Sequence, residues 1–168
     1  VVLSGSGADE LFCGYGRIFG SVEDFYKLKK LGIFENQSDK KKFLKNANNR
    51  YEKIKFKNYL DHFLSVYPYT NEKVKYKILD KKINHTKINF NINRYFSKIF
   101  SEIKTGNYLD KMQYIFQKYH LKGILEREDM SSMASAVELR VPFLDHRLIE
   151  FAATIPLKYK IKMIKKNL

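Results

Sequence analysis

Apolar residues recur three or four positions apart along most of this chain, and that spacing is typical of amphipathic helices. It predicts helices over residues 21–31, 38–64, 71–83, 94–104, 108–125 and 146–155. The apolar run at residues 1–3 is the one clear strand signal, and the Asn-rich residues 84–93 indicate a loop. The pattern therefore predicts a mostly helical α/β chain with little strand.

Residues that start or stop helices set several of these boundaries. Gly32 follows the first predicted helix, Pro68 follows the second, and Pro156 closes the last. Asp145 stands directly before the last helix, where its carboxylate can accept a hydrogen bond from the first turn. Residues 142–144, which begin with proline, are predicted to form an extended turn. There is no internal repeat, heptad pattern or low-complexity linker, so we expect one domain.

The composition is typical of a folded protein, and basic residues strongly outnumber acidic ones. With 168 residues, of which 44% are hydrophobic, the chain can bury a core, and its net charge is +14. Only six of the 32 basic residues are Arg, and the Lys residues are mixed with Asn, Ile, Tyr and Phe. We interpret the charge as the bias of an AT-rich coding sequence and expect no nucleic-acid partner, with a basic polyanion-binding module as the alternative.

Cysteine and histidine usage excludes several kinds of site. The single cysteine, Cys13, rules out an internal disulfide and favours a reducing, cytoplasmic setting. It has no CxxC partner, so we expect a buried apolar side chain rather than a nucleophile. The four histidines are too scattered for a recognisable metal site. No apolar run approaches the ~20 residues that span a bilayer, and no signal-peptide pattern precedes the strand, so we expect no membrane partner.

The strongest chemical signal is the glycine-containing loop at residues 4–7. It follows the predicted strand and precedes a helix start that carries Asp9 and Glu10. Glycines allow close backbone approach, and free N–H groups at a helix start favour phosphate, while the two carboxylates could hold Mg²⁺. A purely structural glycine turn, with both carboxylates complementing the helix dipole, is the alternative.

A second charged segment covers residues 125–147, where charged side chains alternate with small and apolar ones. Charges near a buried surface must be paired or face a ligand. For most of these residues we favour structural ion pairs. The charged residues are Glu126, Arg127, Glu128, Asp129, Glu138, Arg140, Asp145 and Arg147.

The stretches LSGSGADELFCGYGR and DMSSMASAVELRVPFLDHRLIEFAATIP resemble two signature segments of the glutamine-hydrolysing asparagine synthetases. The resemblance covers about residues 1–20 and 107–160, while the Lys- and Asn-rich middle matches mainly in helical character. It implies the C-terminal part of an adenine-nucleotide α-hydrolase-like domain, the Rossmann-like fold of the ATP-pyrophosphatases. The chain would then be one partial synthetase domain over residues 1–168.

The resemblance also implies a reaction. In the family, ATP and Mg²⁺ activate the aspartate side chain as an acyl-adenylate, and pyrophosphate leaves. Ammonia released from glutamine by a glutaminase domain, here in cis or in trans, then gives asparagine and AMP. Mg²⁺ and backbone dipoles must neutralise the leaving group, and the site must exclude water.

Site residues follow from the resemblance position by position. Ser4, Gly5 and Gly7 match the loop that contacts the nucleotide, and Asp9 matches the magnesium-binding aspartate. Glu10 matches the catalytic acidic position on the substrate side. Ser6 matches a second catalytic position, where the family usually has a carboxylate, and a serine cannot supply that charge.

The remaining positions come from the second signature and the end of the chain. Lys165 or Lys166 matches the catalytic lysine that the family carries in this region. The resemblance assigns structural or substrate-side charges to Asp129, Glu138, Arg140 and Asp145, and we interpret Glu138 and Arg140 as an ion pair.

The family's upstream pyrophosphate loop and its glutaminase domain do not occur in these 168 residues. We therefore expect the chain by itself to be inactive in the overall reaction. Two further hypotheses stay open: a related ATP-dependent amidotransferase that activates another carboxylate, which Ser6 favours, and an inactive remnant.

Overall fold

The computed structural model divides the chain into two compact units, and each is described by itself. The first unit joins Val1–Gly20 to Leu109–Leu168, and the second is Ser21–Tyr108. The structure describes residues 1–51, 53–68, 70, 72–80, 82, 85–104 and 106–161. No helix among these residues is long and apolar enough to cross a membrane.

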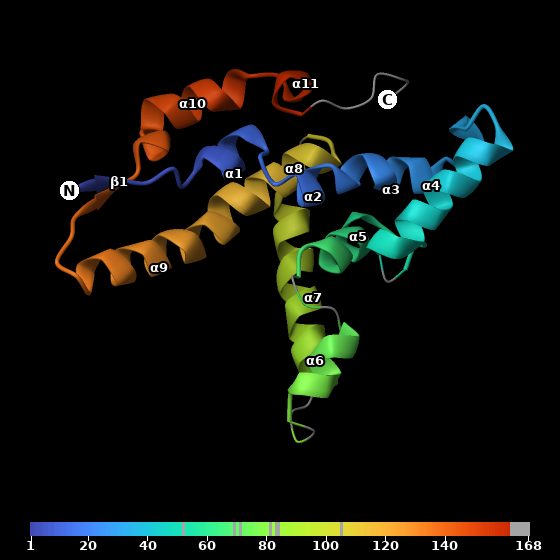
Figure 1. Ribbon diagram of the computed structural model, residues 1–168, viewed down its shortest axis with the longest axis horizontal. Helices are drawn as coiled ribbons and strands as arrows, with labels where there is room; N and C mark the ends of the chain where they lie inside the picture. The colour runs from blue at the N-terminus through green and yellow to red at the C-terminus, as the bar shows by residue number, and fades with distance from the viewer. Residues whose placement is uncertain are drawn as a thin grey trace. The chain divides into compact units, whose positions relative to one another are not determined.

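The first unit carries two short strands and the helices that surround the glycine loop (Figure 1). One long helical run consists of α8, the π-helical segment η2 and α9. The elements are β1 (Val2–Leu3), α1 (Ala8–Phe12), α2 (Gly16–Phe19), α8 (Tyr108–Ile115), η2 (Phe116–His120), α9 (Leu121–Met133), β2 (Leu139–Arg140), the 3₁₀ turn η3 (Pro142–Leu144), α10 (His146–Thr154) and α11 (Leu157–Lys160).

The strands β1 and β2 form a parallel pair, with Val2 opposite Leu139 and Leu3 opposite Arg140. The Ser4 N–H continues the ladder by donating to the Arg140 carbonyl at 2.8 Å. The strand predicted at the start is thus confirmed, but β2 was not predicted. The predicted extended turn at 142–144 is wrong, because these residues form a 3₁₀ turn. Pairing places the glycine loop at the carboxyl ends of both strands.

The core of the first unit lies where α1 meets the long helical run. Leu11 is 1% exposed and Met112 and Phe19 are fully buried. The Phe19 and Phe116 rings pack with centroids 5.1 Å apart. Gln113 Nε2 donates to the Leu11 carbonyl at 2.7 Å, which ties α1 to α8. Because α1 contacts η2 on one side and α10 on the other, the residues that follow the loop are held firmly (Figure 1).

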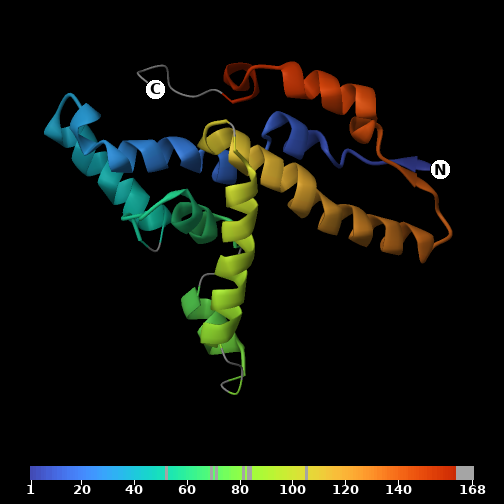
Figure 2. The same cartoon turned by 180° about the vertical axis from the view of Figure 1, so that it is seen from behind.

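The second unit is helical and its core is aromatic. Phe25, His62 and Tyr108 pack together, with ring centroids 5.0–5.5 Å apart. Helix α5 packs on α7, and the Phe63 ring lies 5.1 Å from that of Phe96 (Figure 2). The elements are α3 (Ser21–Lys29), the 3₁₀ turn η1 (Leu31–Ile33), α4 (Gln37–Arg50), α5 (Tyr59–Val66), α6 (Glu72–Ile78) and α7 (His85–Glu102).

The single helix predicted over residues 38–64 is wrong. Helix α4 ends at Arg50, and α5 begins only after Asn58. Asn58 Oδ1 accepts a hydrogen bond from the Asp61 N–H at 2.9 Å, so this side chain starts a new helix instead of continuing the old one. Another predicted helix, at 71–83, is shorter and spans Glu72–Ile78, and its proposed cap Asn71 lies outside the described residues.

The loop predicted at residues 84–93 is also wrong, because α7 already begins at His85. Asn is a poor helix former, which is why the composition favoured a loop. Ile88 and Ile92 nevertheless stand four positions apart, in phase with Phe96. Contacts of Phe96 with α5 then stabilise a helix that local propensity alone does not predict.

Candidate functional site

The loop at residues 4–7 depends on glycine at its last position. Gly7 has φ 96°, a left-handed conformation that side chains other than glycine rarely adopt. A Cβ atom at Gly7 would lie 2.8 Å from Leu144 Cγ, which is too close for two carbon atoms. The close approach of η3 therefore requires glycine here, and it fixes the direction in which the loop enters α1.

A cavity of about 300 Å³ opens on this loop. In the part of the chain that the structure describes, its wall includes the carboxylate residues Asp9 and Glu10 and no Lys or Arg. A bare phosphate would meet negative charge at this wall, so a phosphate group would need a cation beside it. The residues that line the cavity are Ser4, Gly5, Ser6, Gly7, Asp9, Glu10, Tyr15 and Ile124.

Glu10 is a buried carboxylate, only 1% exposed. Tyr15 Oη donates to its Oε1 at 2.7 Å, and Gln117 Nε2 donates to its backbone carbonyl at 3.3 Å. The Tyr15 ring also packs on Phe116 and edge-on to His120. Glu10 is thus held in one orientation at the cavity wall. No local pattern in the sequence indicated Tyr15, because its contact with Glu10 depends on the fold of the loop.

Asp9 differs from Glu10 in being exposed. Its side chain lies against Gly14, where a Cβ would come within 2.8 Å of Asp9 Cγ. Among the described residues no three His, Cys, Asp or Glu side chains are grouped so that they could hold a metal ion. Mg²⁺ is commonly bound by one or two carboxylates together with phosphate oxygens and water. Asp9 fits that arrangement, but not a metal cage made of protein ligands alone.

Glu128 on α9 reaches the loop, a contact that the sequence did not predict. Ser6 Oγ donates to Glu128 Oε1 at 2.5 Å, and Ser4 Oγ lies 3.2 Å from the same oxygen. Ser4 Oγ also accepts from the Ser6 N–H at 3.2 Å. The carboxylate therefore joins α9 to both loop serines, across more than 120 positions of sequence.

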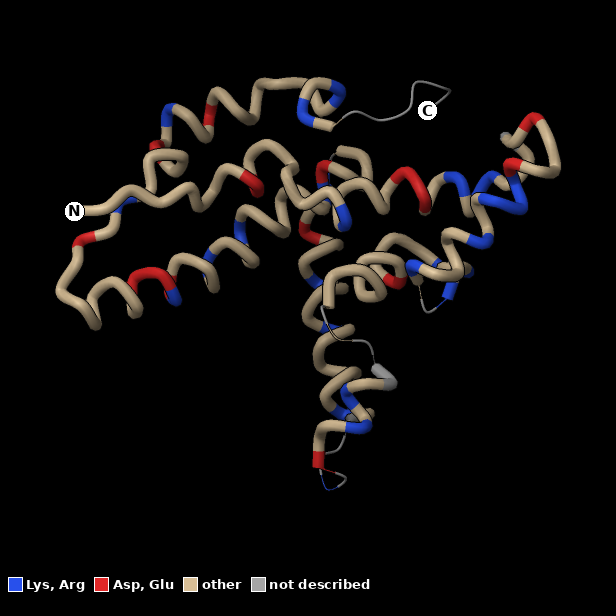
Figure 3. Tube along the Cα trace, in the orientation of Figure 1, with Lys and Arg blue, Asp and Glu red and all other residues tan. Residues whose placement is uncertain are grey.

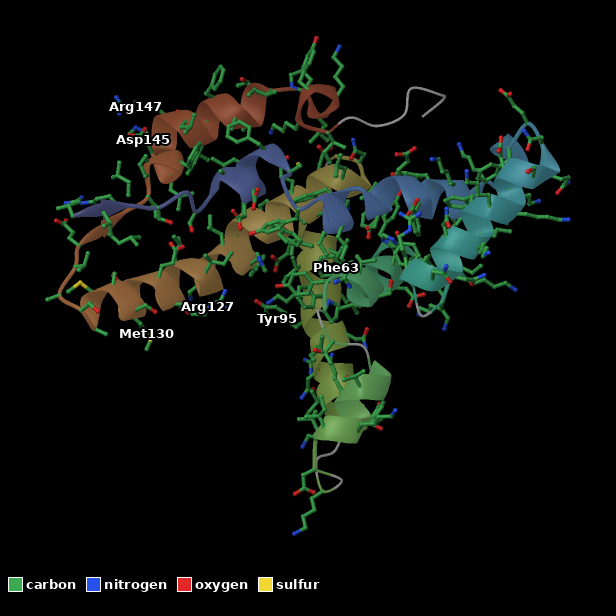
Figure 4. The ribbon with its side chains drawn as sticks, in the orientation of Figure 1. Phe63, Tyr95, Arg127, Met130, Asp145 and Arg147 are labelled. Carbon is green, nitrogen blue, oxygen red and sulfur yellow. The ribbon has the colours of Figure 1, made fainter. Side chains whose placement is uncertain are left out.

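The predicted charges of the second signature lie elsewhere. Asp145 Oδ1 accepts from the Arg147 N–H at 2.9 Å, which confirms the predicted helix cap (Figure 4). Hydrogen bonds from Arg147 hold the pKa of Asp145 well below its usual range. Glu138 and Arg140 form the predicted ion pair at the surface. None of these four residues, nor exposed Asp129, lines the loop cavity.

At the end of the described chain, Lys160 lies near Cys13. Cys13 is 5% exposed, as predicted for a buried apolar side chain, and burial raises the pKa of its thiol to about 11. Burial lowers the pKa of Lys160. The lysines predicted to be catalytic, Lys165 and Lys166, lie outside the described residues.

Charge is distributed differently over the helices of each unit. Figure 3 shows several basic positions on α4 in the second unit, while acidic positions gather near the middle of α9 in the first. The acidic positions include Glu126, Glu128 and Asp129. Among the described residues, the charged side chains that line the loop cavity are acidic.

Parallel strands, a glycine loop at their carboxyl ends and helices around them place the first unit in the α/β class. Comparison with known families is more specific. The model of the asparagine synthase family matches residues 1–168, and the chain belongs to this family.

Two relatives from Bacillus subtilis (strain 168) illustrate the match. The chain is 32% identical over 173 residues to glutamine-hydrolysing asparagine synthetase 1, covering 96% of this chain and 26% of that protein. It is 40% identical over 48 residues to glutamine-hydrolysing asparagine synthetase 3, covering 29% of this chain and 8% of the relative. The chain thus spans about a quarter of the length of the first relative. No solved structure matches it.

Proposed function

We propose that this chain supplies part of the synthetase site of an ATP-dependent ligase that forms asparagine from aspartate. The match of the asparagine synthase family to the whole chain carries this proposal. The glycine loop and the acidic cavity beside it support the location of the site. The fold that we propose for the complete domain is that of the adenine-nucleotide α-hydrolases.

The nucleotide would bind along the loop. Ser4, Gly5 and Gly7 would contact ATP, chiefly through backbone groups that glycine leaves accessible. Asp9 would hold Mg²⁺ together with phosphate oxygens, consistent with its exposure at the cavity wall. When bound, Mg²⁺ supplies positive charge that stabilises the pyrophosphate leaving group.

The buried carboxylate of Glu10 would serve the acceptor side of the reaction. Its Oε1 is fixed by Tyr15 at 2.7 Å, so the group needs little reorganisation to accept an N–H from a substrate. Ammonia attacks the acyl carbon of the aspartyl adenylate and must lose a proton as the amide forms. We infer that Glu10, which lines the cavity, is placed to accept a hydrogen bond from the nitrogen that loses this proton.

Other parts of the reaction depend on groups beyond those described. Lys165 or Lys166 would stabilise negative charge on the phosphates. Ammonia would come from a glutaminase domain, in the same polypeptide or in a separate one. We expect the 168 residues by themselves not to complete the reaction, and we expect a cytoplasmic setting.

The test is aspartate-dependent formation of AMP and pyrophosphate by the native polypeptide that carries this chain, with ammonia or glutamine as nitrogen donor. An Asp9→Asn variant should lower kcat/KM by at least about a hundredfold, as when charge stabilisation of a transition state is lost. An Asp39→Asn variant, changed at an exposed position on α4, should keep wild-type activity. A carboxylate other than aspartate as the preferred substrate would overturn the choice of acid, and no AMP formation with any carboxylate would overturn the proposal.

A further inference from the structure

The serine hydroxyl groups of the loop donate their hydrogen bonds to acceptors within the protein. A serine hydroxyl has one proton to donate and two lone pairs that accept. Ser6 donates to Glu128 Oε1 at 2.5 Å, the short distance expected for a charge-assisted bond. The Ser4 hydroxyl has Ser6 Oγ and both Glu128 oxygens within 3.2–3.3 Å. Toward a ligand, both serine oxygens can therefore only accept hydrogen bonds.

The rest of the cavity wall has the same character. Asp9 and Glu10 add carboxylate oxygens, and no Lys or Arg is among the described residues that line the wall. The Tyr15 hydroxyl, which could donate, is engaged with Glu10 at 2.7 Å. The described side chains of this cavity thus offer acceptors to a ligand.

Glu128 acts on this cavity from behind the loop. It does not line the loop cavity but a neighbouring one of about 600 Å³, together with Arg127, two serines of α9 and Ser135. Its hydrogen bonds connect it to the loop cavity through Ser4 and Ser6. This makes Glu128 a positioning residue, because it decides which way the two hydroxyl protons point.

Acceptor oxygens suit either a metal ion or a group rich in N–H bonds. Asp9 is the carboxylate that we propose for Mg²⁺, and among the described residues no group of three or more His, Cys, Asp or Glu side chains would hold a metal ion beside the serines. A protonated amine needs only two or three acceptors within hydrogen-bond distance, which the serine oxygens and a wall carboxylate provide.

We propose that Glu128 makes the loop select a ligand with a protonated amino group over the same ligand without one. It does so by accepting the hydrogen bonds that the Ser4 and Ser6 hydroxyls would otherwise donate to the ligand. The inference rests on the proposed function, in which the ligand is an amino acid. It assigns the amino group of the amino acid to the serine side of the cavity. Phosphate groups would then meet backbone N–H groups and the cation held by Asp9, not the serine hydroxyls.

The experiment compares two acids that differ in the amino group alone, L-aspartate and succinate, by calorimetric titration of the native polypeptide. The wild type should bind aspartate at least about tenfold more tightly than succinate, the effect of one charge-assisted hydrogen bond. In Glu128→Gln the amide can donate to the serine oxygens and release their protons toward the cavity, so this preference should fall below about twofold. Glu126→Gln is the matched control, since it removes an exposed charge from the same helix.

A double-mutant cycle separates this role from simple support of the loop. In a Ser4→Ala, Ser6→Ala background, Glu128→Gln should change the aspartate preference by less than about twofold. A Glu128→Gln variant that weakens both acids equally, or keeps the wild-type preference, would overturn the inference. Preference changes that persist without the two serines would overturn it too.

Inorganic pyrophosphate, measured with the same variants, keeps the inference testable if the proposed function fails. Freed hydroxyl protons should let Glu128→Gln bind pyrophosphate at least about threefold more tightly than the wild type and than Glu126→Gln. Equal or weaker binding would contradict the inference. If the wild type binds neither aspartate nor MgATP, the proposed function falls, and the pyrophosphate result alone decides the role of Glu128.

Discussion

Acid should destabilise the second unit through one buried histidine. The His62 side chain is fully buried, and its Nδ1 lies 2.6 Å from Tyr108 Oη. Its Nε2 has no hydrogen-bond partner in the part of the chain that the structure describes. Burial lowers the pKa of His62 from 6.5 to about 4, and the nearby charge of Asp61 offsets only part of that effect. Two tyrosines whose hydroxyls can titrate, Tyr51 and Tyr108, also pack against the ring.

The size and sign of the effect follow from this pKa. Above pH 6.5 the histidine is neutral in both the folded and the unfolded chain, so it has no pH-dependent effect. Between pH 6.5 and about 4 the unfolded chain binds the proton and the folded chain does not. The free energy of unfolding therefore decreases as the pH is lowered through this range. The difference between the two pKa values corresponds to a loss of about 3 kcal/mol over that range, at about 1.4 kcal/mol per tenfold change in proton affinity.

Urea unfolding at a series of pH values from 7 to 4 measures this loss. Tyrosine fluorescence can report unfolding, because the chain has 12 Tyr and no Trp. His62→Phe keeps an aromatic ring but cannot titrate, so subtracting its free energy of unfolding from that of the wild type cancels every other group. As the pH is lowered from 7 to 4, the free energy of unfolding of the wild type should decrease by about 3 kcal/mol relative to that of His62→Phe.

A difference between wild type and His62→Phe that stays constant over this pH range would refute the reasoning. An imidazole resonance of His62 that titrates near pH 6.5 in the folded protein would refute it independently. Either result would mean that the ring is more accessible to water than its burial indicates.

Substitutions at three further positions test the local structure through the midpoint of urea unfolding. Gly7→Ala should lower the free energy of unfolding by about 1–3 kcal/mol, because φ is 96° and the new Cβ would press on Leu144; an unchanged midpoint would contradict this conformation. Tyr15→Phe should cost about 1–3 kcal/mol by leaving the buried Glu10 carboxylate without its donor, and a neutral effect would mean that water replaces it. Asn58→Ala should cost about 1 kcal/mol by removing the cap of α5, whereas Asn58→Asp should keep most of that stability.

Local signals in the sequence were sufficient where one residue determines the conformation. The apolar start predicted β1, and Asp145 predicted the beginning of α10, because strand and cap signals act within a few positions. The two signature segments led to the family, which the match over residues 1–168 bears out. Burial of Cys13 followed from its apolar character.

Features that depend on tertiary contacts were not predictable. The start of α7 was missed because Asn-rich residues hide a helical phase that becomes stable only when Phe96 packs on α5. Strand β2 was missed because two residues have no pattern of their own and pair with β1 from a distance. The contact of Glu128 with Ser6 has the same cause, since nothing near position 128 indicates what α9 will face. The roles of Ser6, Glu10 and Asp9 in chemistry remain predictions.

The transfer of oxygen from aspartate to AMP tests the central claim most directly. The native polypeptide would be supplied with MgATP, a nitrogen donor and aspartate labelled with ¹⁸O in its side-chain carboxylate. If that carboxylate attacks the α-phosphate and ammonia then displaces AMP, each asparagine formed must leave one labelled oxygen on AMP. The account predicts one ¹⁸O per AMP by mass spectrometry, and unlabelled AMP, or asparagine made without AMP, would contradict it.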